Sequence, residues 1–124
     1  LITGGDGSDF LNGLAGVDTL VGGDGNDVYV DQVGDDVIVE LPDAGLDRVL
    51  TAAEAPYTLA DGVEELRFFA VRPAHGIGNT LANLIETTSA NDTLDGGAGA
   101  DTLSGTSGND VYHVDDALDQ IVEA

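Results

Sequence analysis

The 124-residue sequence contains no cysteine, methionine, tryptophan or lysine. Without cysteine, the chain has neither a disulfide framework nor a thiolate metal site. Its 3 basic residues are all arginines, against 24 Asp and Glu, and the formal net charge is −21. This charge would repel the phosphates of nucleic acid and an anionic membrane surface. It argues against nucleic acid as a partner and against insertion into a membrane. We expect a cation instead.

Long apolar runs are also missing. No stretch approaches the ~18 consecutive apolar residues of a membrane span, and no N-terminal signal peptide is visible. The opening Leu1-Ile2-Thr3 has the form of the end of a truncated repeat, so we expect the segment to begin and end inside an array. An export signal would then lie elsewhere in the parent protein. Helix-friendly residues occur only in short pieces, Ala52–Glu54 and Ala82–Glu86.

Glycine, in contrast, is abundant at 18 residues, and it accompanies a nine-residue period. A large apolar residue recurs every nine positions, in two sets: Ile2, Leu11, Leu20 and Tyr29, then Ile85, Leu94, Leu103 and Tyr112. An Asp or Asn stands two places before each of them wherever that position is present. The best copies follow the pattern G-G-x-G-x-D-x-U-x, where U is the apolar residue, and begin at Gly4, Gly22 and Gly96.

The second set follows the first at a constant offset, as in Tyr29 and Tyr112. We therefore divide the chain into a glycine-rich block at 1–30, a divergent spacer at 31–82, and a second block with a trailing strand at 83–124. The spacer loses the glycines but keeps a roughly regular spacing of apolar residues, at Ile38, Val49, Leu59, Leu66 or Phe68, and Ile77. We interpret it as the same coil continuing without metal turns, the alternative being an irregular linker.

The period predicts an all-β fold, a right-handed parallel β-roll or β-helix. Each unit divides into a six-residue turn and a three-residue strand, in which only the middle residue points inward. Two units make one turn of a flattened solenoid whose strands stack ~4.8 Å apart. Repeats eighteen residues apart therefore stack directly, which pairs Asp9 with Asp27, Asn83 with Asp101 and Asp92 with Asp110.

Stacked carboxylates require a cation. At an effective dielectric of about 20, two like charges ~4 Å apart repel by roughly 4 kcal/mol. Calcium suits the available ligands, because it takes 6–8 oxygens in a flexible geometry and accepts backbone carbonyls, which glycine turns present freely. Zinc would prefer His or Cys, and magnesium would keep more of its water. With one large apolar residue per repeat, we predict that the glycine blocks are disordered without calcium.

The nonapeptides starting at Gly4, Gly22 and Gly96 resemble the RTX (repeats-in-toxin) calcium-binding family. The resemblance implies a module of a bacterial protein exported by type I secretion, unfolded in the low-calcium cytoplasm and folded outside the cell or at its surface. It also implies that each repeat Asp supplies carboxylate oxygens to two neighbouring sites, with turn carbonyls completing them.

Carried onto this sequence, the resemblance gives six carboxylate ligands: Asp9, Asp18, Asp27, Asp92, Asp101 and Asp110. The other implied metal ligands lie in the turns: Gly4, Asp6, Gly22, Gly23, Asp24, Gly25, Gly96, Ala98, Gly105 and Ser107. Departures from the pattern weaken some sites, namely Leu14 and Thr106 at glycine positions, Asn83 at an Asp position, and the glycine-free turn Thr87–Ala90. We expect about two to four ions in total.

An enzyme is disfavoured, because His75 and His113 are the only histidines and neither has a nucleophile beside it. The stronger rival is an adhesive or carbohydrate-binding module in which calcium is purely structural. Exposed residues of the spacer would bind the glycan or surface ligand: Arg48, Arg67, Phe69 and Arg72. The alternative, which we favour, is that Phe68 or Phe69 belongs to the core and that the arginines pair with nearby acids. Unpaired strands at the ends of the coil also make end-to-end self-association possible.

Overall fold

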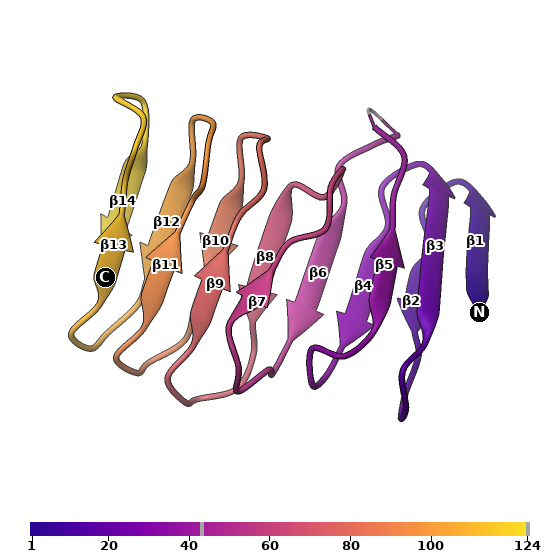
Figure 1. Cartoon of the computed structure of the whole chain (residues 1–124), viewed down its shortest axis with the longest axis horizontal. Helices are drawn as coiled ribbons and strands as arrows, with labels where there is room; N and C mark the ends of the chain where they lie inside the picture. The colour runs from indigo at the N-terminus through magenta and orange to yellow at the C-terminus, as the bar shows by residue number, and fades with distance from the viewer. Residues whose placement is uncertain (43, 124) are drawn as a thin grey trace.

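The computed structural model describes residues 1–42 and 44–123, and within these ranges the chain is all β, with no helix. Residues 43 and 124, which belong to the predicted spacer and second block, lie outside the described residues. Parallel strands stack into a β-solenoid of about seven turns, of the β-roll kind (Figure 1). The predicted fold class is confirmed. No helix long and apolar enough to cross a membrane occurs in the described part of the chain.

Each turn of the solenoid contributes one strand to each of two faces. One face is a continuous seven-stranded sheet: β2 (Phe10–Asn12), β4 (Val28–Asp31), β6 (Arg48–Thr51), β8 (Glu65–Phe68), β10 (Leu84–Glu86), β12 (Thr102–Gly105) and β14 (Gln120–Glu123). The opposite face holds two sheets: β1 (Ile2–Asp6), β3 (Thr19–Asp24) and β5 (Val37–Val39), then β7 (Tyr57–Thr58), β9 (His75–Ile77), β11 (Thr93–Asp95) and β13 (Val111–His113). The opposite face is therefore interrupted between β5 and β7.

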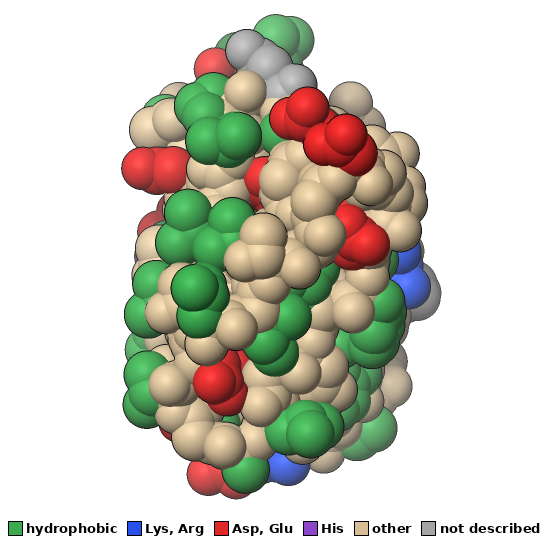
Figure 2. Space-filling view, turned by 90° about the vertical axis from the view of Figure 1, so that its right-hand side faces the viewer, with side chains coloured by type: hydrophobic (Ala, Val, Ile, Leu, Met, Phe, Trp, Pro, Cys, Tyr) green, Lys and Arg blue, Asp and Glu red, His purple; other side chains and the backbone are tan. Residues whose placement is uncertain are grey.

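The core is a column of apolar side chains between the two faces. In register, Leu11 pairs with Tyr29, and Ile85 pairs with Leu103. The repeat residues away from the ends are at most 2% exposed: Leu11, Leu20, Tyr29, Ile85, Leu94 and Leu103. Each such burial contributes roughly 1.5–3 kcal/mol. At the N-terminal end, where no further coil covers it, Ile2 is 36% exposed. Figure 2 views this end and shows apolar and acidic side chains side by side on it.

The segment between the glycine-rich blocks supplies strands to the same sheet. Along the continuous face, Tyr29 pairs with Val49, Val49 with Leu66, and Leu66 with Ile85. The steps between these partners differ from eighteen residues, so the register is held by buried side chains rather than by sequence period. On the opposite face, Gly76 rather than Ile77 is in register with Tyr57 and Leu94. The prediction of Ile77 as the inward apolar residue of this coil is wrong, because Phe68 packs into the space beside Gly76.

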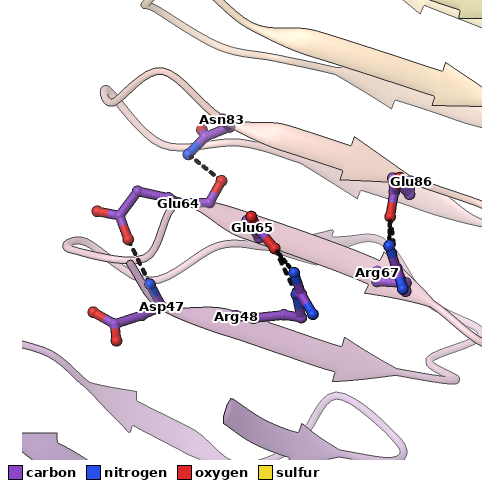
Figure 3. Close-up of polar contacts among 7 residues, drawn as sticks. All are labelled: Asp47, Arg48, Glu64, Glu65, Arg67, Asn83 and Glu86. Carbon is purple, nitrogen blue, oxygen red and sulfur yellow. Dashed lines mark hydrogen bonds and ion pairs between the residues drawn. The ribbon is translucent and has the colours of Figure 1, made fainter. Parts of the chain in front are cut away.

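All three arginines form ion pairs. Arg48 pairs with Glu65 across β6 and β8, and Arg67 pairs with Glu86 across β8 and β10 (Figure 3). The third pair joins Arg72 to Glu54. Phe68 is buried and Phe69 is half exposed. The cationic side chains of the spacer are thus all paired with acids, and the two pairs that join adjacent strands stabilise strand pairing modestly, as exposed pairs do.

Candidate metal centre

The Asp residues of the repeats line the two edges of the roll, each directly before a strand. Asp9, Asp27 and Asp101 precede strands of the seven-stranded sheet, and Asp18, Asp92 and Asp110 precede strands of the opposite face. Because successive coils are in register, each edge collects its carboxylates in a column. The predicted pairs, Asp9 with Asp27 and the two pairs of the second block, are brought together by this stacking.

One oxygen of each stacked carboxylate has a defined partner in the neighbouring coil. The backbone N–H of Asp9 donates to Oδ1 of Asp27 at 2.8 Å, and that of Asp92 donates to Oδ1 of Asp110 at 2.9 Å. Asn83 N–H donates to Oδ1 of Asp101 at 2.8 Å in the same way. These bonds fix the orientation of each carboxylate and leave its second oxygen directed elsewhere.

The second oxygen, Oδ2, is buried without any hydrogen-bond partner in seven aspartates: Asp9, Asp27, Asp31, Asp47, Asp92, Asp101 and Asp110. Asp27 and Asp101 are fully buried, and Asp92 is 1% exposed. A buried carboxylate oxygen without a partner is strongly unfavourable, and such groups in proteins are normally paired or coordinate a metal. Five of the six predicted carboxylate ligands belong to this set; Asp18 is half-buried and does not.

Glycine is required where these oxygens approach the preceding turn. A Cβ atom placed on Gly22 would overlap Oδ2 of Asp27, and one placed on Gly96 would overlap Oδ2 of Asp101. At Gly4 the Cβ would lie 2.5 Å from Oδ2 of Asp9. The glycines thus allow backbone carbonyls and carboxylates to share a small space that a side chain would fill.

The predicted carbonyl donors lie in these turns, but the first turns are more extended than expected. Strand β1 continues through Gly4 to Asp6, and β3 continues through Gly22 and Gly23 to Asp24, with Gly5 paired to Gly23. The expectation of a six-residue turn and a three-residue strand is wrong here, because the glycine segments themselves pair between coils. Gly25, Gly96 and Ala98 lie in loops, Gly105 ends β12, and Ser107 bridges Ser89.

Asn83 replaces an aspartate, and its surroundings differ accordingly. Its side-chain amide donates to the carbonyl of Glu64 at 3.4 Å (Figure 3). The same amide donates to the carbonyl of Val63 at 3.2 Å, and its Oδ1 accepts from the N–H of Asn79. Asn79 in turn donates to the Ala60 and Val63 carbonyls. At the position of Asn83, hydrogen bonds from neutral amides therefore take the place of a carboxylate, and no counterion is needed there.

Three further aspartates extend the columns and were not among the predicted ligands. Asp36 accepts from the Asp18 N–H, Asp119 accepts from the Asp101 N–H, and Asp47 accepts from the Asp27 N–H, at 2.8, 2.9 and 2.8 Å. Asp36 and Asp119 lie one full period beyond their partners, so extending the period finds them. Asp47 lies two residues further along than the period gives, and no motif marks it.

Burial and neighbouring acids perturb these carboxyl groups. Burial, with added repulsion from Glu40, Glu64 and Asp27, raises the pKa of Asp47 to about 6 against the lowering effect of its hydrogen bond from Asp27. Burial likewise raises the pKa of Asp101. Burial and the neighbouring acids disfavour the ionised forms of Asp47 and Asp101, and a bound cation would offset both effects.

The donor set fits calcium. It consists of carboxylate and carbonyl oxygens, which hard cations prefer. Among the described residues, the groups of converging ligand atoms contain only Asp and Glu and no histidine, so they offer no nitrogen or sulfur ligand of the kind zinc favours. The unpartnered Oδ2 atoms and the glycine-lined space beside them together provide sites of the right chemistry.

Comparison with known families agrees with this chemistry. A family model described as the RTX calcium-binding nonapeptide repeat matches in 4 copies, over residues 1–29 and 77–112, just over half of the chain. No curated protein and no solved structure matches the chain. RTX nonapeptide repeats bind Ca²⁺, and the family is a structural calcium-binding module rather than a known enzyme class. The chain belongs to the RTX calcium-binding nonapeptide repeat family.

Proposed function

We propose that this chain is a calcium-dependent structural module of a secreted bacterial protein, and that it folds when Ca²⁺ binds after export. The observation that carries the proposal is the set of buried Oδ2 atoms that lack partners along both edges of the roll. The ligands are the carboxylates of Asp9, Asp18, Asp27, Asp92, Asp101 and Asp110, with turn carbonyls at Gly4, Asp6, Gly22, Gly23, Asp24, Gly25, Gly96, Ala98, Gly105 and Ser107.

Calcium acts in this proposal as the counterion of the folded state. Stacking coils brings carboxylates such as Asp9 and Asp27 into one column, and without a cation their burial opposes folding. With calcium present, ligand binding to the folded form alone stabilises it by mass action. Folding and metal binding are therefore coupled, as in other small metal-dependent domains.

Export gives this coupling a use. RTX proteins are typically secreted by the type I route, which makes an extracellular location the natural proposal. A chain that stays unfolded where calcium is scarce remains competent for translocation and folds where calcium is plentiful. We expect a folding midpoint in the range of roughly 10⁻⁴–10⁻³ M calcium that is typical of extracellular modules.

Circular dichroism tests the proposal. The chain should show strand signal in millimolar calcium and lose it in chelator, and magnesium at the same concentration should not restore it. Magnesium serves as the control for ionic strength and for nonspecific charge screening. Equal strand content in calcium and in chelator would refute calcium-dependent folding.

An adhesive or carbohydrate-binding role is not favoured by a specific contact. The arginines of the candidate surface are paired with Glu65, Glu86 and Glu54.

End-to-end self-association stays a prediction, which sedimentation of the calcium-loaded chain at increasing concentration would test.

A further inference from the structure

Three carboxylates converge where the solenoid leaves the first glycine-rich block. Oxygens of Asp27, Glu40 and Asp47 all lie within 4.8 Å of one another. Asp27 precedes β4, Glu40 follows β5, and Asp47 precedes β6, so the cluster joins three strands at the interruption of the opposite face. Glu40 and Asp47 fall outside the residues that the RTX model matches.

Two members of the cluster are buried with an unused oxygen. Asp27 and Asp47 are both 0% exposed, and Oδ2 of each has no hydrogen-bond partner. Oδ1 of Asp47 is occupied by the Asp27 N–H at 2.8 Å, which leaves Oδ2 as its free ligand atom. Buried, unpartnered carboxylate oxygens on two adjacent coils are what a cation bound between the coils would satisfy.

Tyr29 holds the third carboxylate in place. Its buried hydroxyl donates to Oε2 of Glu40, and the N–H of Leu41 donates to Oε1 of Glu40 at 2.9 Å. A Cβ placed on Gly22 would overlap both the Tyr29 hydroxyl and Oδ2 of Asp27, and would lie 2.5 Å from Oε2 of Glu40. The Tyr29 hydroxyl, Oδ2 of Asp27 and Oε2 of Glu40 thus lie around one point that a residue larger than glycine would fill.

The nearest arginine in sequence does not neutralise the cluster. Arg48 follows Asp47 directly, but it pairs with Glu65 on β8. Figure 3 shows the Asp47 carboxylate pointing away from Arg48. Glu64 adds a further negative charge beside Asp47, since its carboxylate accepts the Asp47 N–H at 2.8 Å.

We propose that Asp27, Glu40 and Asp47 form an additional calcium site, at a joint that the nonapeptide motif does not encode. The inference rests on the proposed function, because it requires a module that binds calcium. An all-oxygen set of three carboxylates selects a hard divalent cation, and the site fastens β5 and β6 to the end of the first glycine block.

Part of the same arrangement recurs in the second block. Tyr112 and Glu123 stand at the spacing of Tyr29 and Glu40, and the Tyr112 hydroxyl accepts the N–H of Gly105 at 3.1 Å. A Cβ on Gly105 would overlap both the Tyr112 hydroxyl and Oδ2 of Asp110. The recurrence supports a built arrangement of Asp, Tyr and Glu after each block, rather than a chance cluster.

Calorimetric calcium titration of the whole chain tests the site. The double variant Glu40→Gln with Asp47→Asn should bind one ion fewer than the parent, while the remaining ions bind within about threefold of their parental affinity. A control removes the same charge from exposed positions, with Glu54→Gln and Asp61→Asn, and should keep the full number of ions. If the parent binds calcium and the site variant binds the same number with the same affinity, this inference fails and the proposed function stands. If the parent binds none, both fail.

Terbium luminescence covers the case in which the double variant does not fold. Tb³⁺ occupies calcium sites and emits when excited through a nearby tyrosine. Tyr29→Phe keeps the ring and all three carboxylates but removes the hydroxyl that holds Glu40 and the phenol that sensitises Tb³⁺, so tyrosine-sensitised emission should fall. Unchanged emission at an unchanged number of ions would place no ion beside Tyr29 and would overturn the inference.

Discussion

The backbone N–H of Asp9 donates a 2.8 Å hydrogen bond to Oδ1 of Asp27, one full coil further along the chain. The bond orients the Asp27 carboxylate so that its other oxygen is buried beside Gly22, where a Cβ would overlap it. A single aspartate thereby ties two coils together through one oxygen and presents the other as a ligand. This division of roles between the two oxygens explains why the repeat uses aspartate and glycine together.

Replacing Asp27 with Asn separates the two roles. The amide oxygen keeps an acceptor for the Asp9 N–H, but the charge is removed. We expect calcium affinity to fall at least about tenfold, or ~1.4 kcal/mol, because a carboxylate ligand is lost. Calorimetry measures the change, and the exposed substitution Asp61→Asn is the control. Parental affinity in Asp27→Asn would exclude Asp27 as a ligand.

Gly22→Ala tests whether the turn needs its open space. The added methyl would overlap Oδ2 of Asp27 and the Tyr29 hydroxyl, so we expect at least one bound ion to be lost and stability to fall by about 1–3 kcal/mol. Gly16→Ala is the comparison, because Gly16 has φ of 109° and nothing within 4 Å of its Cβ position. That variant should be strained yet bind the full number of ions. If Gly22→Ala binds the same number of ions as the parent, the open space beside Gly22 is not needed for calcium binding.

Asn83→Asp restores the consensus residue at the one column position that uses an amide. The change removes the donor to the Val63 and Glu64 carbonyls and places a carboxylate against them. We expect a loss of about 1–3 kcal/mol in urea unfolding, and no additional bound ion. Asn91→Asp is the matched control, since Asn91 acts only as an acceptor from the Asn109 N–H. An Asn83→Asp variant that is more stable than the parent and binds one more ion would contradict both expectations.

The period of the sequence predicts the core and most of each column, because a register of eighteen residues fixes which side chains stack. The same period reaches Asp36 and Asp119, which accept from Asp18 and Asp101. Asp47 is beyond its reach, since two extra residues separate Asp27 from its partner in the next coil. Only the three-dimensional register reveals it.

The spacer at 31–82 is harder to predict from the sequence than the glycine-rich blocks. Its apolar residues show where strands lie, but not their phase, and a shift of one residue exchanges the inner and outer faces. At β9 the inward place belongs to Gly76, because Phe68 and Leu66 already fill that part of the core. Side-chain volume from neighbouring coils decides this phase, and volume is not visible in a linear pattern.

Amide hydrogen exchange, followed by mass spectrometry with and without calcium, tests the central claim most directly. With calcium bound, residues 1–30 and 83–113 should exchange slowly, because their amides are held in the stacked strands and carboxylate ladders. In chelator the same segments should exchange at the rate of an unfolded chain. Equal protection of both segments in calcium and in chelator would contradict a fold that depends on the metal.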